Sequence, residues 1–268
     1  MSAVVIDSGL IHYEAFGRGQ PVLFLHGWLG SWRYWMSTME AISDKYRTYA
    51  LDLWGFGDSD KSRPRYEISD YVTLINNFTD NMGIREAPIV GHSLGATIAL
   101  EYTVRFPDRA KKVMAVSLPV TADSIIKSRI TGFTKDSNRL LKVFGRGKIT
   151  HKEVEQEMLK TESEAIAKSL ESVAELDVMS RIQMVAQSAD AVLLAVYGEK
   201  DDIIIPDPER LNLNGSAKNI RPIGLADSKH FPMLEDAAKF NRLLQDFLDV
   251  ENDLSVLELK EEWRRRTR

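Results

Sequence analysis

Short apolar runs alternate with helical patterns along most of the chain. Two alternating segments at 3–7 and 11–16 predict an N-terminal hairpin. Further strands are expected where continuous apolar runs occur, with the last run the weakest: 21–27, 47–55, 87–91, 111–117, 191–198 and 219–227. Together these segments predict an eight-stranded sheet.

Helices are expected between the strands, because apolar residues recur there at 3.6-residue spacing. The clearest patterns lie at 71–82, 94–106 and 240–247, and Pro107 ends the second of them. Strands that alternate with helices indicate an α/β class protein, with a mostly parallel sheet and helices on both faces.

The alternation stops between about 120 and 187, where no strong strand pattern occurs. Two candidate capping boxes pair Thr150 with Glu153 and Thr161 with Glu164. Helical spacing continues at Ile166, Leu170 and Val173. We therefore expect an all-helical insertion between the sixth and seventh strands.

Composition narrows the class of protein. The chain has 268 residues, 44% of them hydrophobic and 28% charged, which is typical of a globular domain. It has no cysteine, which excludes disulfides and thiolate chemistry. The net charge of −4 argues against a nucleic-acid partner. We expect no secretory signal and no membrane span, and hence a cytoplasmic protein.

Ser93 is the first candidate for chemistry. It lies in the stretch Gly-His-Ser-Leu-Gly, directly between the strand at 87–91 and the helix at 94–106. A reversal that tight needs small residues, which Gly91 and Gly95 supply. It exposes the serine at the C-terminal edge of the sheet, beside the first amides of a helix. A purely structural turn is the alternative interpretation of this motif.

A serine nucleophile needs a base, and the chain has five histidines. His12 and His151 are expected at the surface, and His92 in the core with its side chain directed away from Ser93. His230 follows the last strand, so its loop lies on the same edge as Ser93. We therefore predict His230 as the base.

The base needs an acid to orient it, and the oxyanion needs backbone donors. Glu199, Asp201 and Asp202 follow the strand that ends at Gly198. The amide of Leu94 is one expected oxyanion donor. The loop after the first long buried strand supplies the other at Trp28, with Gly27 allowing a close approach to the substrate.

Metal and phosphate chemistry are not expected. The histidines are scattered and no His-Glu-x-x-His motif occurs, so we predict no metal site. The stretch at 54–61 is glycine-rich but lacks the phosphate-loop pattern. No cofactor is predicted.

Taken together, these blocks resemble the α/β-hydrolase superfamily, in the branch with a helical cap after the sixth strand. The resemblance covers about residues 3–250 and rests on blocks in the right order: LHGWLGS, LDLWGFGDSDK, IVGHSLGATIALEYTVRFPDR, VYGEKDDIIIP and DSKHFPMLEDAAKF. It implies a discontinuous core of 1–119 and 188–268, with a cap at 120–187. It also implies a triad of Ser93, His230 and an aspartate.

The family pattern leaves two candidates for the acid. Asp201 has the expected distance from Gly198, whereas Asp202 has the expected distance to Pro206. We choose Asp201, with Asp202 as the alternative.

The resemblance implies a carboxylic ester hydrolase for small to medium, mostly uncharged substrates. Haloalkane dehalogenases and epoxide hydrolases of this fold use an aspartate nucleophile, so Ser93 disfavours both. A thioesterase, a carbon–carbon bond hydrolase and a perhydrolase remain open on the same triad. An alternative of another class is a ligand-sensing receptor on a hydrolase scaffold.

The tail at 253–268 extends past the last expected helix of the family. Val256, Leu259 and Trp263 could share one helical face. The tail is interpreted either as a surface helix or as a docking helix for another copy or a partner.

Overall fold

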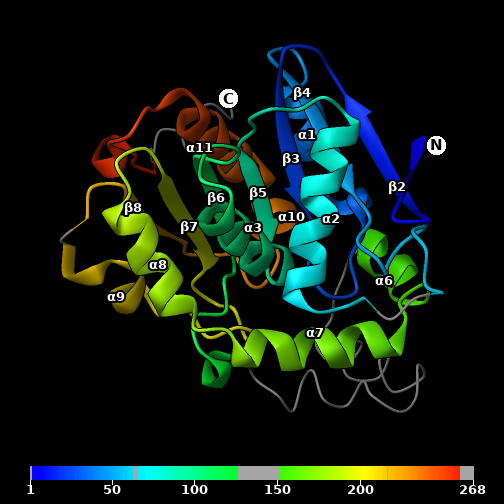
Figure 1. The fold of residues 1–268 in the computed structure, drawn as a ribbon. Helices are drawn as coiled ribbons and strands as arrows, with labels where there is room; N and C mark the ends of the chain where they lie inside the picture. The colour runs from blue at the N-terminus through cyan, green and yellow to red at the C-terminus, as the bar shows by residue number, and fades with distance from the viewer. Residues whose placement is uncertain (1, 63–64, 126–150, 216, 260–268) are drawn as a thin grey trace, which may run out of the picture.

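The computed structural model describes residues 2–62, 65–125, 151–215 and 217–259. Its centre is one sheet with the strand order β1-β2-β4-β3-β5-β6-β7-β8 (Figure 1). The strands are β1 Ser2–Ile6, β2 Gly9–Phe16, β3 Gln20–Leu25, β4 Tyr46–Leu51, β5 Ile89–His92, β6 Lys112–Val116, β7 Val192–Gly198 and β8 Ile220–Leu225. Strands β3 to β8 pair in parallel, and β2 pairs antiparallel with β1 and β4. The predicted mostly parallel eight-stranded sheet is confirmed.

Helices cover both faces of the sheet (Figure 1). Helices α2, α3 and α8 pack side by side on one face, and α1 and α11 pack together on the other. The α-helices are α1 Met36–Ile42, α2 Ile68–Asn81, α3 Leu94–Arg105, α6 Lys152–Met158, α7 Ser163–Glu175, α8 Val178–Gln187, α9 Pro208–Leu211, α10 Pro232–Glu235 and α11 Ala237–Asp249. Short 3₁₀ helices occur at Trp32–Trp35 (η1), Ala122–Ser124 (η2), Leu213–Gly215 (η4) and Leu254–Val256 (η5).

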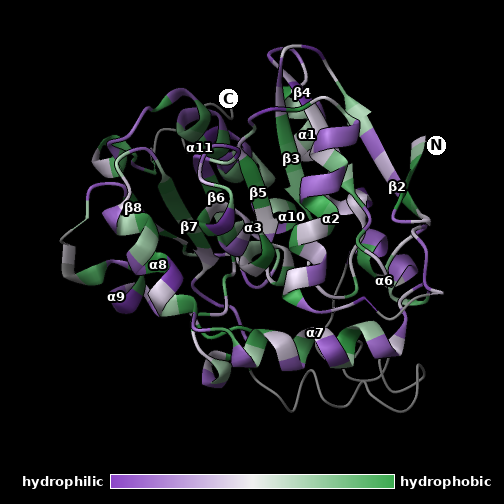
Figure 2. Cartoon of the chain, in the orientation of Figure 1, coloured by the Kyte–Doolittle hydropathy of each residue, from purple (hydrophilic) through white to green (hydrophobic). Residues whose placement is uncertain are grey.

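The core lies between the sheet and these helices. A parallel strand covered on both faces buries every side chain, and β3 from Val22 to Leu25 does so. Figure 2 shows the central strands as mostly hydrophobic and the helices as two-faced. In α11 the buried side chains are Phe240, Leu243, Leu244, Phe247 and Leu248. The periodicity that predicted this helix therefore marks the face that packs on the sheet.

Between β6 and β7 the described residues form helices and add no strand to the sheet. Helix α7 runs across the end of the sheet where the parallel strands finish, with α6 beside it (Figure 1). Helix α8, in contrast, packs against α3 and β7. We therefore propose that the cap ends with α7 at Glu175 and that α8 belongs to the core layer.

Several local expectations differ from the structure. The segment from Trp32 to Ile42 is helical (η1 and α1), although its aromatic-rich sequence shows no clear 3.6-residue pattern. The capping box expected at Thr161 is wrong. Helix α7 has Glu162 at its N-cap, and the Thr161 hydroxyl donates to the Glu157 carbonyl instead. Thr150 lies outside the described residues.

The tail does not form the expected α-helix in its described part. Leu254–Val256 is a 3₁₀ turn, and Leu257 and Leu259 that follow are irregular. Leu254 and Leu257 are buried, whereas Val256 points to solvent and is 67% exposed. Trp263 lies outside the described residues. The docking role of the tail stays a prediction.

Among the described residues, no helix has the length and apolar character needed to cross a membrane.

Candidate active site

Ser93 occupies a sharp reversal between β5 and α3. Its backbone has φ 53° and ψ −111°, a conformation that costs a non-glycine residue free energy. The two flanking glycines are sterically required. A Cβ on Gly91 would lie 2.2 Å from the Gly95 carbonyl oxygen, and one on Gly95 would lie 2.3 Å from the Leu25 carbonyl oxygen. The turn therefore packs its backbone directly against the end of β3.

The hydroxyl of Ser93 is buried and has no hydrogen-bond partner among the described residues. Helix α3 begins at Leu94, so the Leu94 amide has no intrahelical acceptor. The positive end of the helix dipole is directed at the same place. Within the described part of the chain, the elbow thus combines a buried hydroxyl that is not hydrogen-bonded with a backbone amide that has no acceptor in its own helix.

Asp201 and His230 form a buried hydrogen-bonded pair in the loops that follow β7 and β8. Asp201 Oδ2 lies 2.9 Å from His230 Nδ1, and the two side chains are 1% and 8% exposed. Asp201 Oδ1 accepts hydrogen bonds from the amides of Ile203 (2.9 Å) and Ile204 (3.0 Å). The carboxylate is therefore held by both oxygens and keeps Nδ1 of His230 protonated.

The surroundings hold Asp201 in its charged form. Burial by itself raises the pKa of Asp201, but the positive charge and hydrogen bond of His230 and the two backbone amides outweigh burial and lower it. Asp202, the next residue in the chain, is half-buried. Of the two candidate acids, Asp201 is the one that contacts His230.

The loops that carry Asp201 and His230 are joined through backbone hydrogen bonds. The Lys200 amide donates to the Ser228 carbonyl at 3.0 Å, and the Glu199 amide donates to the Leu225 carbonyl at 3.1 Å. A Cβ on Gly198 would lie 2.0 Å from the Lys229 carbonyl oxygen. Glycine at the end of β7 therefore allows the histidine loop to pack against the acid loop.

The loop after β3 lies against the elbow. A Cβ on Gly27 would lie 2.9 Å from Cβ of Ser93, so only glycine fits there. The Gly30 amide donates to the Gly27 carbonyl at 3.2 Å, which closes a turn. Leu29 in that turn has φ 64°, an unusual conformation for a leucine. This tight turn places the backbone of Trp28 next to the loop that carries Ser93.

Tyr34 and His92 connect this loop to His230. His92 is fully buried, and burial together with nearby His230 lowers the pKa of His92 well below its usual range. Its Nε2 donates to the His230 carbonyl at 2.8 Å, so its neutral Nδ1 accepts from the Tyr34 hydroxyl at 3.1 Å. The Tyr34 oxygen accepts from the Gly27 amide. Gly27 therefore allows the loop to approach Ser93 closely but has no free amide to offer an oxyanion. His92 lies in the core, as predicted.

Other histidines have structural partners. His26 Nε2 accepts from the Leu53 amide at 2.9 Å, so its Nδ1 donates to the Gly27 carbonyl at 2.8 Å. The expectation of a surface position for His12 is wrong, because its side chain is 4% exposed and pairs with Asp52 at 2.9 Å. His12 is buried where β2 contacts the loop that follows β4. His151 is half-buried at the start of α6, with its ring 6.2 Å from the ring of Phe231.

The cap is tied to this site at several points. The indole N–H of Trp28 donates to Ser169 of α7 at 2.8 Å. Glu157 of α6 is buried and accepts from Arg33 at 3.0 Å and pairs with Lys160 at 3.1 Å. Lys160 also pairs with Asp58 of the core at 2.9 Å. Helices α6 and α7 therefore contact the loops after β3 and β4 through polar bonds.

One group among the described residues has spacing that suits a metal ion: His12, Asp52 and Asp58. His12 Nδ1 and the Asp58 amide both already contact Asp52 Oδ2 at 2.9 Å, and the Trp32 amide donates to Asp52 Oδ1 at 2.8 Å. The carboxylate thus serves as a hub for loop hydrogen bonds.

Sequence reasoning missed three participants: Tyr34, Ser117 and Ser169. Ser117 donates to the His230 carbonyl at 3.3 Å, beside the bond from His92. None of these residues belongs to a recognisable motif. Their partners lie 7 to 141 positions away in the chain, so only the folded structure identifies them.

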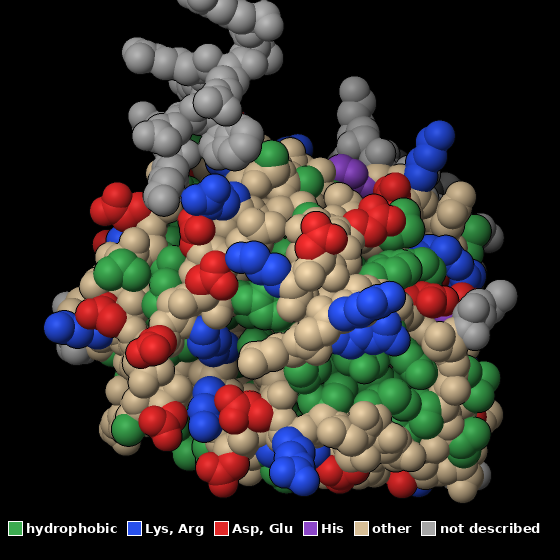
Figure 3. All heavy atoms as spheres, turned by 90° about the horizontal axis from the view of Figure 1, so that it is seen from above, with side chains coloured by type: hydrophobic (Ala, Val, Ile, Leu, Met, Phe, Trp, Pro, Cys, Tyr) green, Lys and Arg blue, Asp and Glu red, His purple; other side chains and the backbone are tan. Residues whose placement is uncertain are grey.

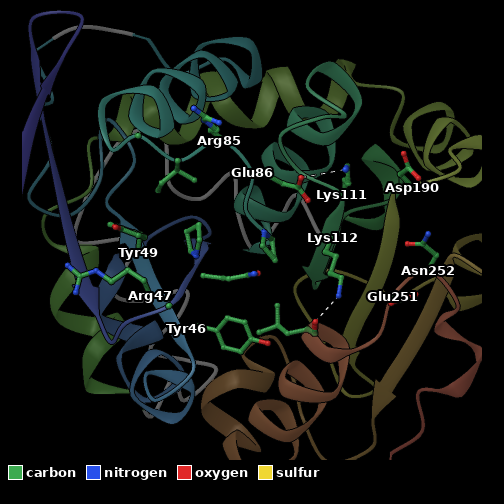
Figure 4. Close-up of a pocket in the computed structure, with 17 residues that line it drawn as sticks. Tyr46, Arg47, Tyr49, Arg85, Glu86, Lys111, Lys112, Asp190, Glu251 and Asn252 are labelled. Carbon is green, nitrogen blue, oxygen red and sulfur yellow. Dashed lines mark hydrogen bonds and ion pairs between the residues drawn. The ribbon is translucent and has the colours of Figure 1, made fainter.

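A groove lies at the opposite edge of the sheet, where the parallel strands begin. It is an open groove of about 910 Å³ whose labelled lining residues include Tyr46, Arg47, Glu86, Lys111 and Lys112 (Figure 4). Seen from above, that side of the molecule carries basic and acidic side chains interspersed (Figure 3). Lys111 pairs with Glu86 at 3.5 Å, and Lys112 donates to the Leu248 carbonyl at 2.7 Å. Both lysines therefore already have partners.

Comparison with known proteins places the chain among hydrolase-like folds. A family model described as alpha/beta hydrolase fold matches residues 20–153. An enol-lactonase from Burkholderia xenovorans LB400 superposes with a TM-score of 0.76 at 18% identity, over 92% of this chain and 99% of that one. At that identity the likeness shows the fold.

Two curated relatives differ in the extent of their match. The dihydrolipoyllysine-residue acetyltransferase component of the acetoin cleaving system from Cupriavidus necator is 26% identical over 91% of this chain and 67% of its own length. Human epoxide hydrolase 4 is 34% identical over 42% of this chain, and the match spans only one third (33%) of that protein.

Proposed function

Because the chain belongs to the α/β-hydrolase fold family, we propose that it is a serine hydrolase that cleaves carboxylic esters through an acyl-enzyme. In this proposal Ser93 Oγ attacks the ester carbonyl while His230 Nε2 takes the serine proton. His230 then gives that proton to the departing alcohol. A water molecule, activated by His230, releases the acid from Ser93.

Asp201 and the backbone amides stabilise the charges that develop in this reaction. Asp201 stays ionised and stabilises the imidazolium of His230 through Nδ1. The amides of Leu94 and Trp28 stabilise the oxyanion, because fixed donors cost no reorganisation when the charge appears. Gly27 allows the substrate to approach and makes no such bond.

One observation supports this proposal most: the buried 2.9 Å contact between Asp201 and His230 on the edge where Ser93 is held in a strained elbow. A hydrogen bond between Ser93 and His230 is not required before substrate binds, since catalytic hydrogen bonds often tighten only in the complex. Among the relatives, the enol-lactonase is named for an internal ester, a bond that a serine nucleophile can cleave. A small to medium uncharged ester is the proposed substrate.

A chain-length series of p-nitrophenyl esters and acyl-CoA thioesters tests the proposal on wild type and Ser93→Ala. We expect ester turnover with a burst, and a loss of about 10⁴- to 10⁶-fold in Ser93→Ala. A fluorophosphonate should label wild type on Ser93 and leave the variant unlabelled. Unchanged melting temperatures show that both proteins are folded.

Other outcomes would assign the site differently. Preference for acyl-CoA indicates a thioesterase on the same residues. Full activity in Ser93→Ala contradicts the proposal outright. No turnover and no labelling of wild type, together with a melting temperature raised by a small ligand, favours the receptor interpretation.

A further inference from the structure

Trp28 connects the nucleophile side of the site to the cap. Its backbone follows Gly27, which packs against Ser93, and its side chain reaches α7. We propose that Ser169 of α7 is a positioning residue for Trp28, so that the cap holds one oxyanion donor in place. This inference rests on the proposed function, in which the Trp28 amide contacts the oxyanion.

The hydrogen bond between the two side chains has only one direction. The indole N–H of Trp28 can only donate, and it lies 2.8 Å from Ser169 Oγ. The hydroxyl of Ser169 donates its single proton back into its own helix, with Oγ 2.5 Å from the Ala165 carbonyl oxygen. Ser169 is 0% exposed and Trp28 is 9% exposed. Water therefore has little access to replace this bond.

Helix α7 is itself attached to the core, so it can act as a fixed reference. The Glu162 amide before the helix donates to the Gly55 carbonyl at 2.8 Å. Further along, the Ile68 amide at the start of α2 donates to Ser172 Oγ at 3.0 Å. A Cβ on Gly55 would lie 2.4 Å from Cβ of Ala165, so helix and loop are in direct contact.

Trp28 is thus held at both ends. The turn closed by Gly27 and Gly30 restrains its backbone, and Ser169 restrains its indole ring. A tryptophan side chain has two rotatable bonds, so holding the indole limits how residue 28 can rotate in the turn. A small displacement of the amide weakens the oxyanion bond, which matters only in the transition state. The expected signature is therefore a lower kcat with little change in KM.

Two serines of α7 provide a matched comparison. Ser169 and Ser172 both accept a hydrogen bond from the core, but only Ser169 contacts the oxyanion loop. With p-nitrophenyl acetate we expect Ser169→Ala to lower kcat about tenfold, with KM within about twofold. Ser172→Ala should leave both constants within about twofold of wild type. Trp28→Phe should resemble Ser169→Ala, and the double variant should be no worse than either, because the two changes remove the same bond.

A second measurement reports the contact without turnover. In protein carrying ¹⁵N-labelled tryptophan, the indole signal absent from Trp28→Phe belongs to Trp28. We expect Ser169→Ala to move that signal and to speed its hydrogen exchange, whereas Ser172→Ala leaves it in place.

The outcomes separate this inference from the proposed function. Equal kcat in the two serine variants, additive losses in the double variant, or an unmoved indole signal overturns the positioning role while ester hydrolysis stands. Wild type with neither ester turnover nor labelling of Ser93 overturns the proposed function, and this inference with it.

Discussion

The two edges of the central sheet differ in how deeply their charged side chains are buried. At the edge where the strands end, Asp201 and His230 are paired at 2.9 Å and almost fully buried. At the edge where the strands begin, Lys111 and Glu86 lie 3.5 Å apart and are 38% and 51% exposed (Figure 4). The first edge is covered by α7, and the second is an open groove.

This difference is the reason why the proposed reaction is assigned to the edge where the strands end. Charges excluded from water interact strongly and keep fixed partners, whereas an exposed pair is screened and contributes little. Loops that follow the strands also bring the amides of a helix start to Ser93. Substitutions at the two edges should therefore differ in their effect on kcat.

Among these substitutions, replacing Asp201 with asparagine should give the largest loss. Without the carboxylate, His230 loses the partner that fixes its tautomer and stabilises its charge, so kcat should fall by about 10³- to 10⁴-fold on p-nitrophenyl acetate. Asp202→Asn, one residue further along, is the control and should stay within about threefold of wild type. Equal losses in both variants would contradict the assignment of Asp201.

Tyr34→Phe should have a smaller effect on activity and a clear effect on stability. It leaves the Gly27 amide and His92 Nδ1 without their buried partner, which should cost about 1–3 kcal/mol in the free energy of unfolding. We also expect kcat to fall about tenfold, because the bond from His92 to the His230 carbonyl loses its support.

The control for Tyr34 is Tyr71→Phe. This second buried tyrosine donates to the Trp54 carbonyl at 3.1 Å, and among the described residues its hydroxyl makes no hydrogen bond to Ser93, Asp201 or His230. It should lower stability without lowering kcat. A Tyr34 variant that behaves like the Tyr71 variant would show that Tyr34 serves the fold alone.

His12 should make stability depend on pH. The hydrogen bond and charge of Asp52, with Glu14 and Asp58 nearby, raise the pKa of His12 above its ordinary 6.5 against the opposing effect of burial. Because the folded state binds the proton more tightly, this contribution is complete below 6.5 and is lost as pH rises through the raised pKa. Urea unfolding across that window should show a decline in wild type that His12→Gln flattens. A decline of equal slope in the variant would exclude His12 as its source.

Two adjacent lysines at the open edge should show the smallest effects. Lys112→Ala removes a donor to the last carbonyls of α11 and should cost about 1 kcal/mol of stability. Lys111→Ala breaks only the exposed pair with Glu86 and should cost about 0.5 kcal/mol or less. Neither variant should change kcat. A loss of activity in either variant, measured on the same ester, would show that the groove contributes to the reaction and would contradict the contrast between the two edges.

Much of the fold could be predicted from the sequence, because its signals are local. Apolar runs such as 191–198 and the periodic helix at 240–247 correspond to β7 and α11. The elbow around Ser93 depends on glycines two residues away on either side. The sequence pattern did not predict a helix where aromatic residues obscure the 3.6-residue period, as in the segment from Trp32 to Ile42.

Local sequence patterns were enough to predict the strand–elbow–helix unit at Ser93 and the order in which nucleophile, acid and base candidates occur. The contact of Asp201 with His230, the burial of His12 and the hydrogen bond from Trp28 to Ser169 became visible only in the folded chain. The reason is physical. A turn or a helix depends on neighbours within a few positions, whereas a hydrogen bond across 141 positions exists only after the cap and the core have packed against each other.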